Sequence, residues 1–259
     1  SIPSALHGPA YPVYLSVFSR LGATTIFDHR MASILAGTGI VLVAGLLARR
    51  VAGDRAMVIA ATLAAIYPNL WIIDGVLFPE GLFALCSGLV ALAAYRWIRT
   101  HALRDAALTG LLIGVAAMVR GEGLFLSALL VLPLVARSSG LGWQQKVKTL
   151  AVAALGVIIA LGPWTVRNAT TFDAFVSLST NGDELNVYAN CEDTYSGKYL
   201  GFWLFDCQER IRQVSGEAPG DEAERAKYWR DIGWTYAREH ADQLPKVVAA
   251  RIGRQWELF

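Results

Sequence analysis

The sequence predicts an all-α protein that crosses a membrane several times, a polytopic helical bundle followed by an extracytoplasmic segment. Of its 259 residues, 54% are hydrophobic and only 17% are charged, whereas soluble domains carry about a quarter charged residues. The apolar residues also gather into runs close to the length of about 20 residues that a membrane span requires. The net charge is only +2, so nothing indicates a nucleic-acid partner.

Residues 1–30 are expected to form an extracytoplasmic loop with a short helix. Pro9 and Pro12 fix the backbone on either side of Tyr11, which predicts an extended run HGPAYP before a helix begins. That helix is too short to span a membrane and amphipathic enough to lie at its surface. His7 would then face the outer side, or it would merely cap a turn; from the residues alone the second interpretation is preferred.

About six membrane spans are expected in residues 31–162. By their apolar runs they cover residues 31–48, 56–73, 79–95, 106–119, 124–136 and 149–161. Pro68 is expected to kink the second span, and Pro79 with Glu80 suits the start of the third. The four-residue spacing of Gly110 and Gly114 favours close helix packing.

The topology depends on residues 106–136, which could form one long helix or two short helices joined by the turn RGEG at 120–123. Two helices place loops 49–55, 96–104 and 137–148 on one side, and each of these loops carries three Lys or Arg. The positive-inside rule makes that side cytoplasmic. We therefore predict two helices, with Arg120 and Glu122 at the extracytoplasmic end instead of mid-bilayer, where a charge is costly.

The same topology gathers the other polar residues of the spans on the outer face. They are Asp74, Glu80, Trp164, Arg167 and Asn168. The segment 163–259 follows on that side and leads toward a further span. Cys191 and Cys207, sixteen positions apart in it, are expected to pair in an oxidising compartment, with two free thiols as the alternative. Cys86 in the third span is expected to be an inert apolar residue.

Two kinds of structure are expected within the segment 163–259. Residues 170–210 are rich in Asn, Gly, Thr and aromatic residues and are expected to be loops that could cover a site. There Asn181, Asp183 and Asn186 could bond the hydroxyl groups of a ligand or simply be solvated. Residues 221–240 are expected to form a helix.

Four motifs occur in a fixed order along the chain. They are HGPAYP at 7–12, LFPEGLF at 77–83, AMVRGEGLF at 117–125 and PWTVRNATTFDAFVSLSTNG at 163–182. Their order and spacing resembles the GT-C superfamily of membrane glycosyltransferases, in particular bacterial proteins related to protein mannosyltransferases and lipid A aminoarabinose transferases. The corresponding runs there are H-P-P-L-Y-P, L-x-T-E-x-L, L-x-R-P-E-G and P-W-x-x-R-N followed by S-T-N-G. This chain departs from them at Gly8, Gly121 and Phe78-Pro79.

The resemblance implies sugar transfer from a polyprenyl-phosphate donor to a lipid, glycan or protein acceptor, at the extracytoplasmic face of the inner (cytoplasmic) membrane. Arg120 would contact the donor phosphate, and His7 and Tyr11 would line the donor pocket. Glu80 and Glu122 would hold these basic groups or sugar hydroxyls. Arg167, Asn168 and Asn181 would also bind the donor phosphate or the substrate, with Arg167 and Asn168 where the last span meets the outer segment. No cofactor is fixed by the resemblance, and a divalent metal stays open.

One element that the resemblance implies is missing from the sequence. Family members carry an essential acid just before the His-Pro run, but here no Asp or Glu precedes Asp28. We expect the acid on a span that precedes Ser1, so that this chain is an inactive fragment; Asp28 or Asp74 taking over the role is the weaker alternative. The absence of a signal peptide and the closing run RQWELF also favour a fragment.

The residue chemistry agrees with such a role for the RGEG turn. Arginine offers paired donors that match phosphate oxygens, and Gly121 and Gly123 permit a tight turn. A simple Arg–Glu pair that closes the turn is the structural alternative. A transporter or flippase of lipid-linked sugars is the rival function, but it predicts midplane charges and internal repeats, which the sequence lacks. A membrane scaffold would leave the ordered motifs unexplained.

Overall fold

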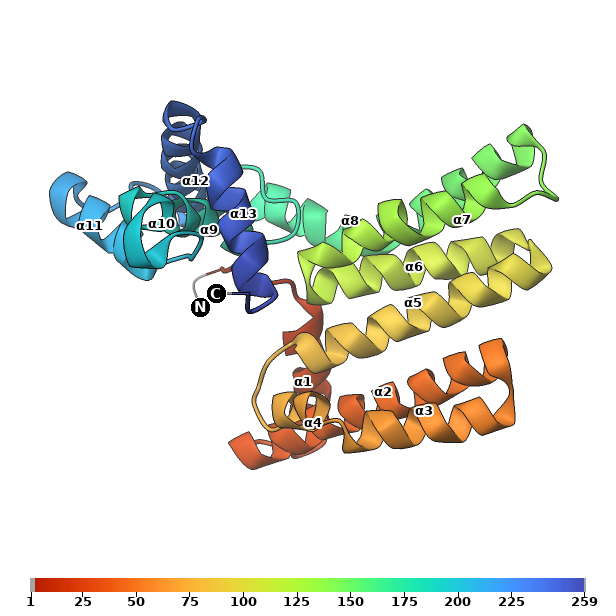
Figure 1. The fold of residues 1–259 in the computed structure, drawn as a ribbon. Helices are drawn as coiled ribbons and strands as arrows, with labels where there is room; N and C mark the ends of the chain where they lie inside the picture. The colour runs from red at the N-terminus through yellow and green to blue at the C-terminus, as the bar shows by residue number, and fades with distance from the viewer. Residues whose placement is uncertain (1–2, 259) are drawn as a thin grey trace. The chain divides into compact units, whose positions relative to one another are not determined.

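The computed structural model describes residues 3–258, except for the side chain of Asp74, and this part of the chain contains helices and no strands (Figure 1). The predicted all-α fold class is therefore confirmed. The helix bounds are α1 (Ala10–Arg20), α2 (Ile26–Ala52), α3 (Asp54–Ile66), α4 (Pro68–Asp74), α5 (Glu80–Thr100), α6 (Leu103–Val119), η1 (Gly121–Leu124), η2 (Ser127–Val131), α7 (Leu132–Arg137), α8 (Trp143–Thr171), α9 (Asn181–Ala189), α10 (Glu192–Tyr195), η3 (Gly197–Tyr199), α11 (Phe205–Ser215), α12 (Glu222–Glu239) and α13 (Leu244–Gln255).

The chain divides into two compact units. The first, here called the bundle unit, is Gly8–Trp164; the second, the C-terminal unit, combines Ser1–His7 with Thr165–Phe259. Each unit is described by itself. The predicted division at residues 30 and 162 concerns membrane boundaries and stays a prediction.

In the bundle unit the helices run back and forth as antiparallel neighbours (Figure 1). Within residues 3–258, three helices are long and apolar enough to cross a membrane: α2, α5 and α8. The helix α6, with 17 residues, is shorter. The expectation of a single kinked span over 56–73 is wrong, because α3 ends at Ile66 and α4 begins at Pro68. Tyr67 between them has an extended backbone, with ψ 112°, as the residue before a proline prefers.

The expected pair of short helices around RGEG is present. Helix α6 ends at Val119, and the next residue, Arg120, has an extended backbone with φ −146° and ψ 130°. A 3-10 turn and a π-helical turn then lead into α7. A Cβ on Gly123 would lie 2.6 Å from the Ala117 nitrogen, so only glycine lets the turn fold back this tightly. The returning Val131 and Val135 then pack with Ile113 in a buried core.

Small residues let α6 and α8 approach closely, as the glycine spacing predicts. A Cβ on Gly110 would lie 1.9 Å from the Ala153 carbonyl oxygen, and one on Gly114 would lie 2.5 Å from the Ala160 Cβ. The helices therefore pack almost backbone to backbone, which strengthens dispersion contacts where lipid offers no hydrophobic driving force.

Helix α8 does not end before Pro163, and that expectation is wrong. The helix continues through Pro163 to Thr171, because a proline removes only one bond of the helical ladder. The hydroxyl of Thr171 donates to the Arg167 carbonyl at 2.6 Å, which satisfies an acceptor in the last turn.

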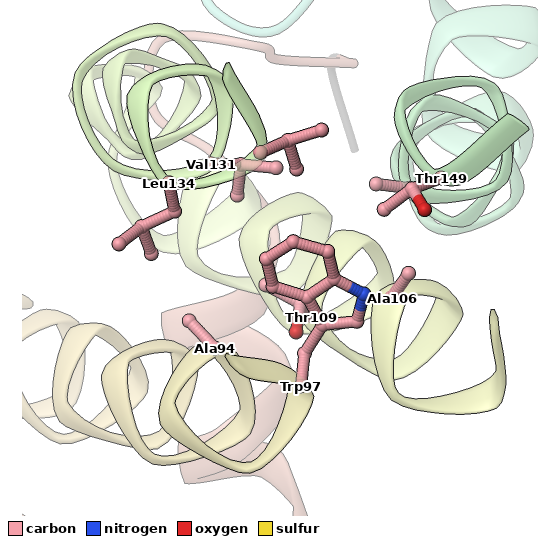
Figure 2. Close-up of a pocket in the computed structure, with 9 residues that line it drawn as sticks. Ala94, Trp97, Ala106, Thr109, Val131, Leu134 and Thr149 are labelled. Atoms are coloured by element: carbon pink, nitrogen blue, oxygen red, sulfur yellow. The ribbon is translucent and has the colours of Figure 1, made fainter. Parts of the chain in front are cut away.

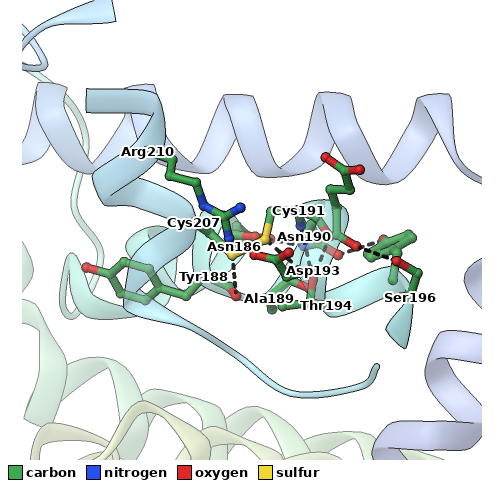
Figure 3. Close-up of a disulfide and its surroundings, with 12 residues drawn as sticks. Asn186, Tyr188, Ala189, Asn190, Cys191, Asp193, Thr194, Ser196, Cys207 and Arg210 are labelled. Carbon is green, nitrogen blue, oxygen red and sulfur yellow. Dashed lines mark hydrogen bonds and ion pairs between the residues drawn. A yellow bond between two sulfur atoms is a disulfide. The ribbon is translucent and has the colours of Figure 1, made fainter. Parts of the chain in front are cut away.

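The C-terminal unit corrects the expectation of loops over 170–210. Helices α9, α10 and α11 occupy much of this range, and α9 starts directly at the STNGDELNVYAN run, with Asp183 and Glu184 in its positive first turn. Cys191 and Cys207 form a disulfide with an S–S length of 2.03 Å, and Arg210 pairs with Asp193 beside it (Figure 3). These two links fasten α10 to α11.

The helix expected over residues 221–240 is present as α12. Asp221 caps it through a capping box with Glu224, an arrangement that satisfies free N–H groups at a helix start. Trp229 of α12 packs against Val187 and Tyr188 of α9 in a buried cluster. This cluster gives the C-terminal unit its own core.

Candidate functional site

The strongest polar cluster of the bundle unit is formed by Glu80, Arg120 and Glu122, here called the Arg120 cluster. Glu80 is the first residue of α5, Arg120 follows α6, and Glu122 lies in the turn η1. The Arg120 Nη1 pairs with Glu80, and its Nη2 donates to the Glu122 Oε1 at 3.1 Å. A third contact, from Arg120 Nε to Glu122 Oε2, measures 3.5 Å. The guanidinium is thus held on two edges by carboxylates.

The electrostatics of the Arg120 cluster are unbalanced. One guanidinium faces two carboxylates, which leaves a formal charge of about −1 if all three groups are ionised. The hydrogen bond from Arg120 holds the pKa of the Glu122 carboxyl below its ordinary value, and the same contact raises the pKa of Arg120. The Glu80 Oε2 is buried and finds no hydrogen-bond partner among the described residues. A buried acceptor left in this state is destabilising, and such exceptions often mark functional sites.

The Arg120 cluster and the basic loops lie at opposite ends of the bundle unit (Figure 1). At the basic end, the Tyr95 hydroxyl donates to the Arg50 carbonyl at 2.7 Å, and Arg96 pairs with Asp105 at 3.0 Å. At the other end, Ala10 of α1 packs with Val119 and Cys86, close to the starts of α5 and η1. The charges are therefore sorted along the bundle as the two-helix topology predicts.

Tyr11 is buried in the bundle unit and its hydroxyl is already engaged. It lies 2.9 Å from the Ser33 Oγ, and this contact fastens α1 to α2. The neighbouring Gly8 comes so close to α6 that a Cβ there would lie 2.1 Å from the Met118 carbonyl oxygen. This close approach gives a physical reason for glycine at a position where the related motif has proline.

The two weaker acid candidates differ in what the structure describes. The Asp28 carboxylate accepts the Thr25 N–H at 2.9 Å, and the Thr25 hydroxyl accepts the Asp28 N–H at 3.1 Å. This capping box gives Asp28 a structural task at the start of α2. Asp74 is the last residue of α4, but its side chain lies outside the described part of the chain.

The remaining predicted residues belong to the C-terminal unit and surround the segment 3–7. His7 is exposed there. Arg167 donates to the Ser4 carbonyl at 3.3 Å and to the Asn168 Oδ1 at 2.9 Å. Asn168 is fully buried, and the Asn181 N–H donates to the Leu6 carbonyl at 3.2 Å. The Arg167 side chain and the Asn181 N–H thus bond to the backbone of residues 4–6, and the role of these residues in substrate binding stays a prediction.

A small cavity of the bundle unit lies between residues of α5, α6, α7 and α8 (Figure 2). Trp97, Thr109 and Thr149 are among its lining residues, and its volume of about 10 Å³ is close to the least that holds one water molecule. It is too small and too apolar for a sugar or a lipid headgroup. Within residues 3–258, no group of three or more His, Cys, Asp or Glu is placed to hold a metal ion.

A protein-family model, described as dolichyl-phosphate-mannose-protein mannosyltransferase, matches residues 6–166. The match therefore includes the Arg120 cluster, the whole HGPAYP run and most of α8. No curated protein and no solved structure matches the chain.

Proposed function

The chain belongs to the dolichyl-phosphate-mannose-protein mannosyltransferase family, and we propose that it transfers a sugar from a polyprenyl-phosphate carrier at the Arg120 end of its bundle unit. Family and apolar helices together make it a multi-pass membrane protein of a glycosyltransferase class. The observation that carries the proposal is the Arg120 cluster, a guanidinium held between two carboxylates at the end of the bundle opposite the basic loops.

The chemistry assigns each part of this cluster a task. In the transfer, an acceptor hydroxyl forms a bond to the anomeric carbon, the bond from that carbon to the phosphate oxygen breaks, and the polyprenyl phosphate leaves with the electron pair. The hydroxyl proton passes to a base. Arg120 would stabilise the negative charge that grows on the leaving phosphate, with the paired donors that suit phosphate oxygens.

The two carboxylates would act through Arg120. Glu80 lies half-buried and pairs with one edge of the guanidinium, whereas Glu122 is exposed and pairs with another. A phosphate that binds Arg120 competes with both carboxylates for its N–H groups, and the exposed Glu122 costs less to displace. Glu80 would then keep the guanidinium oriented while the donor is bound.

The site is proposed to face the extracytoplasmic side of the inner membrane, with a lipid, glycan or protein acceptor. Loops 49–55, 96–104 and 137–148 with three Lys or Arg each favour the cytoplasm for the opposite end. The Cys191–Cys207 disulfide supports an oxidising compartment for the C-terminal unit. These two supports come from different parts of the chain.

The test is Arg120→Ala in the full-length protein, assayed in membranes with a polyprenyl-phosphate sugar. We expect the rate to fall by roughly 100- to 1,000-fold, the typical effect of removing a donor that stabilises developing charge, without loss of expression or of the folded state. The matched control is Arg49→Ala, because Arg49 also forms an arginine–carboxylate pair, with Asp54 at 2.6 Å, but at the basic end. Normal turnover by Arg120→Ala would remove Arg120 from the site.

A further inference from the structure

The backbone just before His7 is held by a set of contacts inside the C-terminal unit. Ala5 is 1% exposed. Its N–H donates to the Glu222 Oε1 at 2.7 Å, and its carbonyl accepts the Thr180 N–H at 2.9 Å. The backbone N–H and carbonyl of Ala5 are therefore both hydrogen-bonded to residues that lie far away in the sequence.

The residues on either side of Ala5 are held in the same way. The Leu6 carbonyl accepts the Asn181 N–H at 3.2 Å, and the Ser4 carbonyl accepts from Arg167 at 3.3 Å. Three successive residues are thus fastened to α8, to the start of α9 and to α12. An extended segment with this many long-range bonds cannot shift by itself, since each bond would have to break.

Glu222 is the centre of this arrangement. The same carboxylate oxygen that accepts the Ala5 N–H also accepts the Thr180 hydroxyl at 3.1 Å, and Thr180 is fully buried. Glu222 is the first residue of α12, directly after its cap Asp221, where a carboxylate is favoured by the helix dipole. Hydrogen bonds to an ionised acceptor are shorter and stronger than neutral ones. The charge of Glu222 thus contributes to both bonds.

We propose that Glu222 is a positioning residue that fixes the backbone of residues 4–6 and thereby the start of the His7 segment. The hydrogen bonds by which Glu222 and Thr180 hold Ala5 are here called the Glu222 clamp. A role of this clamp in sugar transfer rests on the proposed function, whereas the clamp itself does not. Thr180 and Asn181, the Thr and Asn of the STNG run, act with Glu222 on this backbone through their N–H groups. Glu222 belongs to the C-terminal unit and lies outside the part of the chain that the family model matches.

The experiment uses the full-length protein with Glu222→Ala, Glu222→Gln and the control Glu239→Ala. Glu239 is an exposed glutamate at the opposite end of the same helix. The first measurement is amide hydrogen exchange of a peptide that contains Ala5. With Glu222→Ala we expect the Ala5 amide to exchange roughly tenfold faster or more, the loss that follows from removing a charged acceptor. Glu222→Gln keeps an acceptor oxygen and is expected to give a smaller increase, and Glu239→Ala none.

The second measurement is sugar transfer by the same variants, with kcat and KM determined separately at a temperature at which all variants are folded. The family resemblance has His7 line the donor pocket, so a positioning role predicts a fall in kcat of roughly tenfold for Glu222→Ala, since small misplacements at a reacting centre are costly. Glu222→Gln should recover part of it, and the melting temperature should not account for the loss.

Each outcome decides one part of the inference. Unchanged exchange at Ala5 in Glu222→Ala would overturn the clamp. Faster exchange with unchanged kcat would support the clamp and overturn the positioning role, while the proposed function would stand. A wild-type protein that transfers no sugar would overturn the proposed function and the positioning role with it, and the exchange result would still decide the clamp.

Discussion

Two arginine–carboxylate clusters lie at opposite ends of the same helix pair, α5 and α6, and they are built differently. At the basic end, Asp105 is 2% exposed; its two oxygens accept from Arg96 at 3.0 Å and from the Thr100 hydroxyl at 2.5 Å. At the other end, Arg120 serves two carboxylates and the Glu80 Oε2 has no partner among the described residues. One cluster is satisfied and the other is not.

The difference indicates what each cluster is for. A buried carboxylate whose oxygens are both paired stabilises the helix connection around it, and removing a partner is costly. A cluster with an excess carboxylate and an unpaired oxygen contributes less to folding than its charges suggest, but it keeps a guanidinium partly exposed and oriented. That state is suited to a ligand that brings its own negative charge, as a lipid phosphate does.

The largest difference between the two clusters is expected when Arg120 and Arg96 are each replaced by lysine, in two separate variants. In Arg120→Lys the positive charge remains, but the fork that reaches two carboxylates and a phosphate is lost. We expect transfer to fall by roughly 10- to 100-fold, about the worth of one or two charge-assisted bonds, with an unchanged melting temperature. Arg96→Lys should change transfer by less than about twofold, because only the Nε of Arg96 pairs with Asp105. Equal effects of the two variants would contradict the functional distinction between the two ends.

The two turns at the ends of the bundle give a second comparison. Gly123→Ala places a Cβ 2.6 Å from the Ala117 backbone, whereas a Cβ at Gly140, in the turn between α7 and α8, meets nothing within 4 Å. Overpacking against a backbone costs about 1–3 kcal/mol, so Gly123→Ala should lower the free energy of unfolding by that amount and reduce transfer, because the same turn carries Arg120. Thermal unfolding of the purified protein measures the first effect. Gly140→Ala should be neutral in both assays.

Neutralising one carboxylate at each end separates folding from function. Asp105→Asn replaces a paired oxygen by an amide nitrogen and should cost about 2 kcal/mol of stability, the price of an unsatisfied buried group. Glu80→Gln puts the amide where the unpaired oxygen is, so stability should change by less than about 0.5 kcal/mol. Removing this negative charge should lower the KM for the anionic donor roughly fivefold, the effect of one unit charge near a protein surface. An unchanged KM would show that the donor phosphate does not approach Glu80.

Local signals in the sequence predicted the parts of the fold that depend on local chemistry. The positive loops and the glycines around Arg120 are sufficient to identify two short helices with a turn between them, and the spacing of Gly110 and Gly114 identifies a close packing face. The sequence predicts a kink at Pro68, but the helix breaks completely at Tyr67. The sequence predicts that a helix ends before Pro163, but α8 continues through it, since one lost hydrogen bond does not end a helix whose neighbouring bonds persist.

The parts that could not be predicted depend on contacts between distant residues. Arg167 and Asn181 are predicted to bind substrate, and the sequence does not predict that the Arg167 side chain and the Asn181 N–H also bond to the backbone of residues 4–6. Glu222 carried no sequence signal beyond its place after a helix cap. Its contact to Ala5 spans 217 positions, and no local pattern encodes such a pairing. The helices over 170–210 were missed for a related reason, because their stability comes from the disulfide and from packing on α12.

The smallest predicted effect is a pH dependence at the Arg120 cluster. The hydrogen bond from Arg120 lowers the pKa of Glu122 from its ordinary 4.5, so the folded state favours the ionised carboxylate. The resulting stabilisation is fully present above about pH 4.5 and is lost as the pH falls through the lowered pKa. Because Glu122 is exposed, the pair contributes at most about 1 kcal/mol. Glu122→Gln should therefore melt slightly below the wild type near neutral pH, and the difference should vanish in strong acid. In an Arg120→Ala background the same substitution should have no pH-dependent effect, and a difference that persisted there would assign the shift to a group other than Arg120.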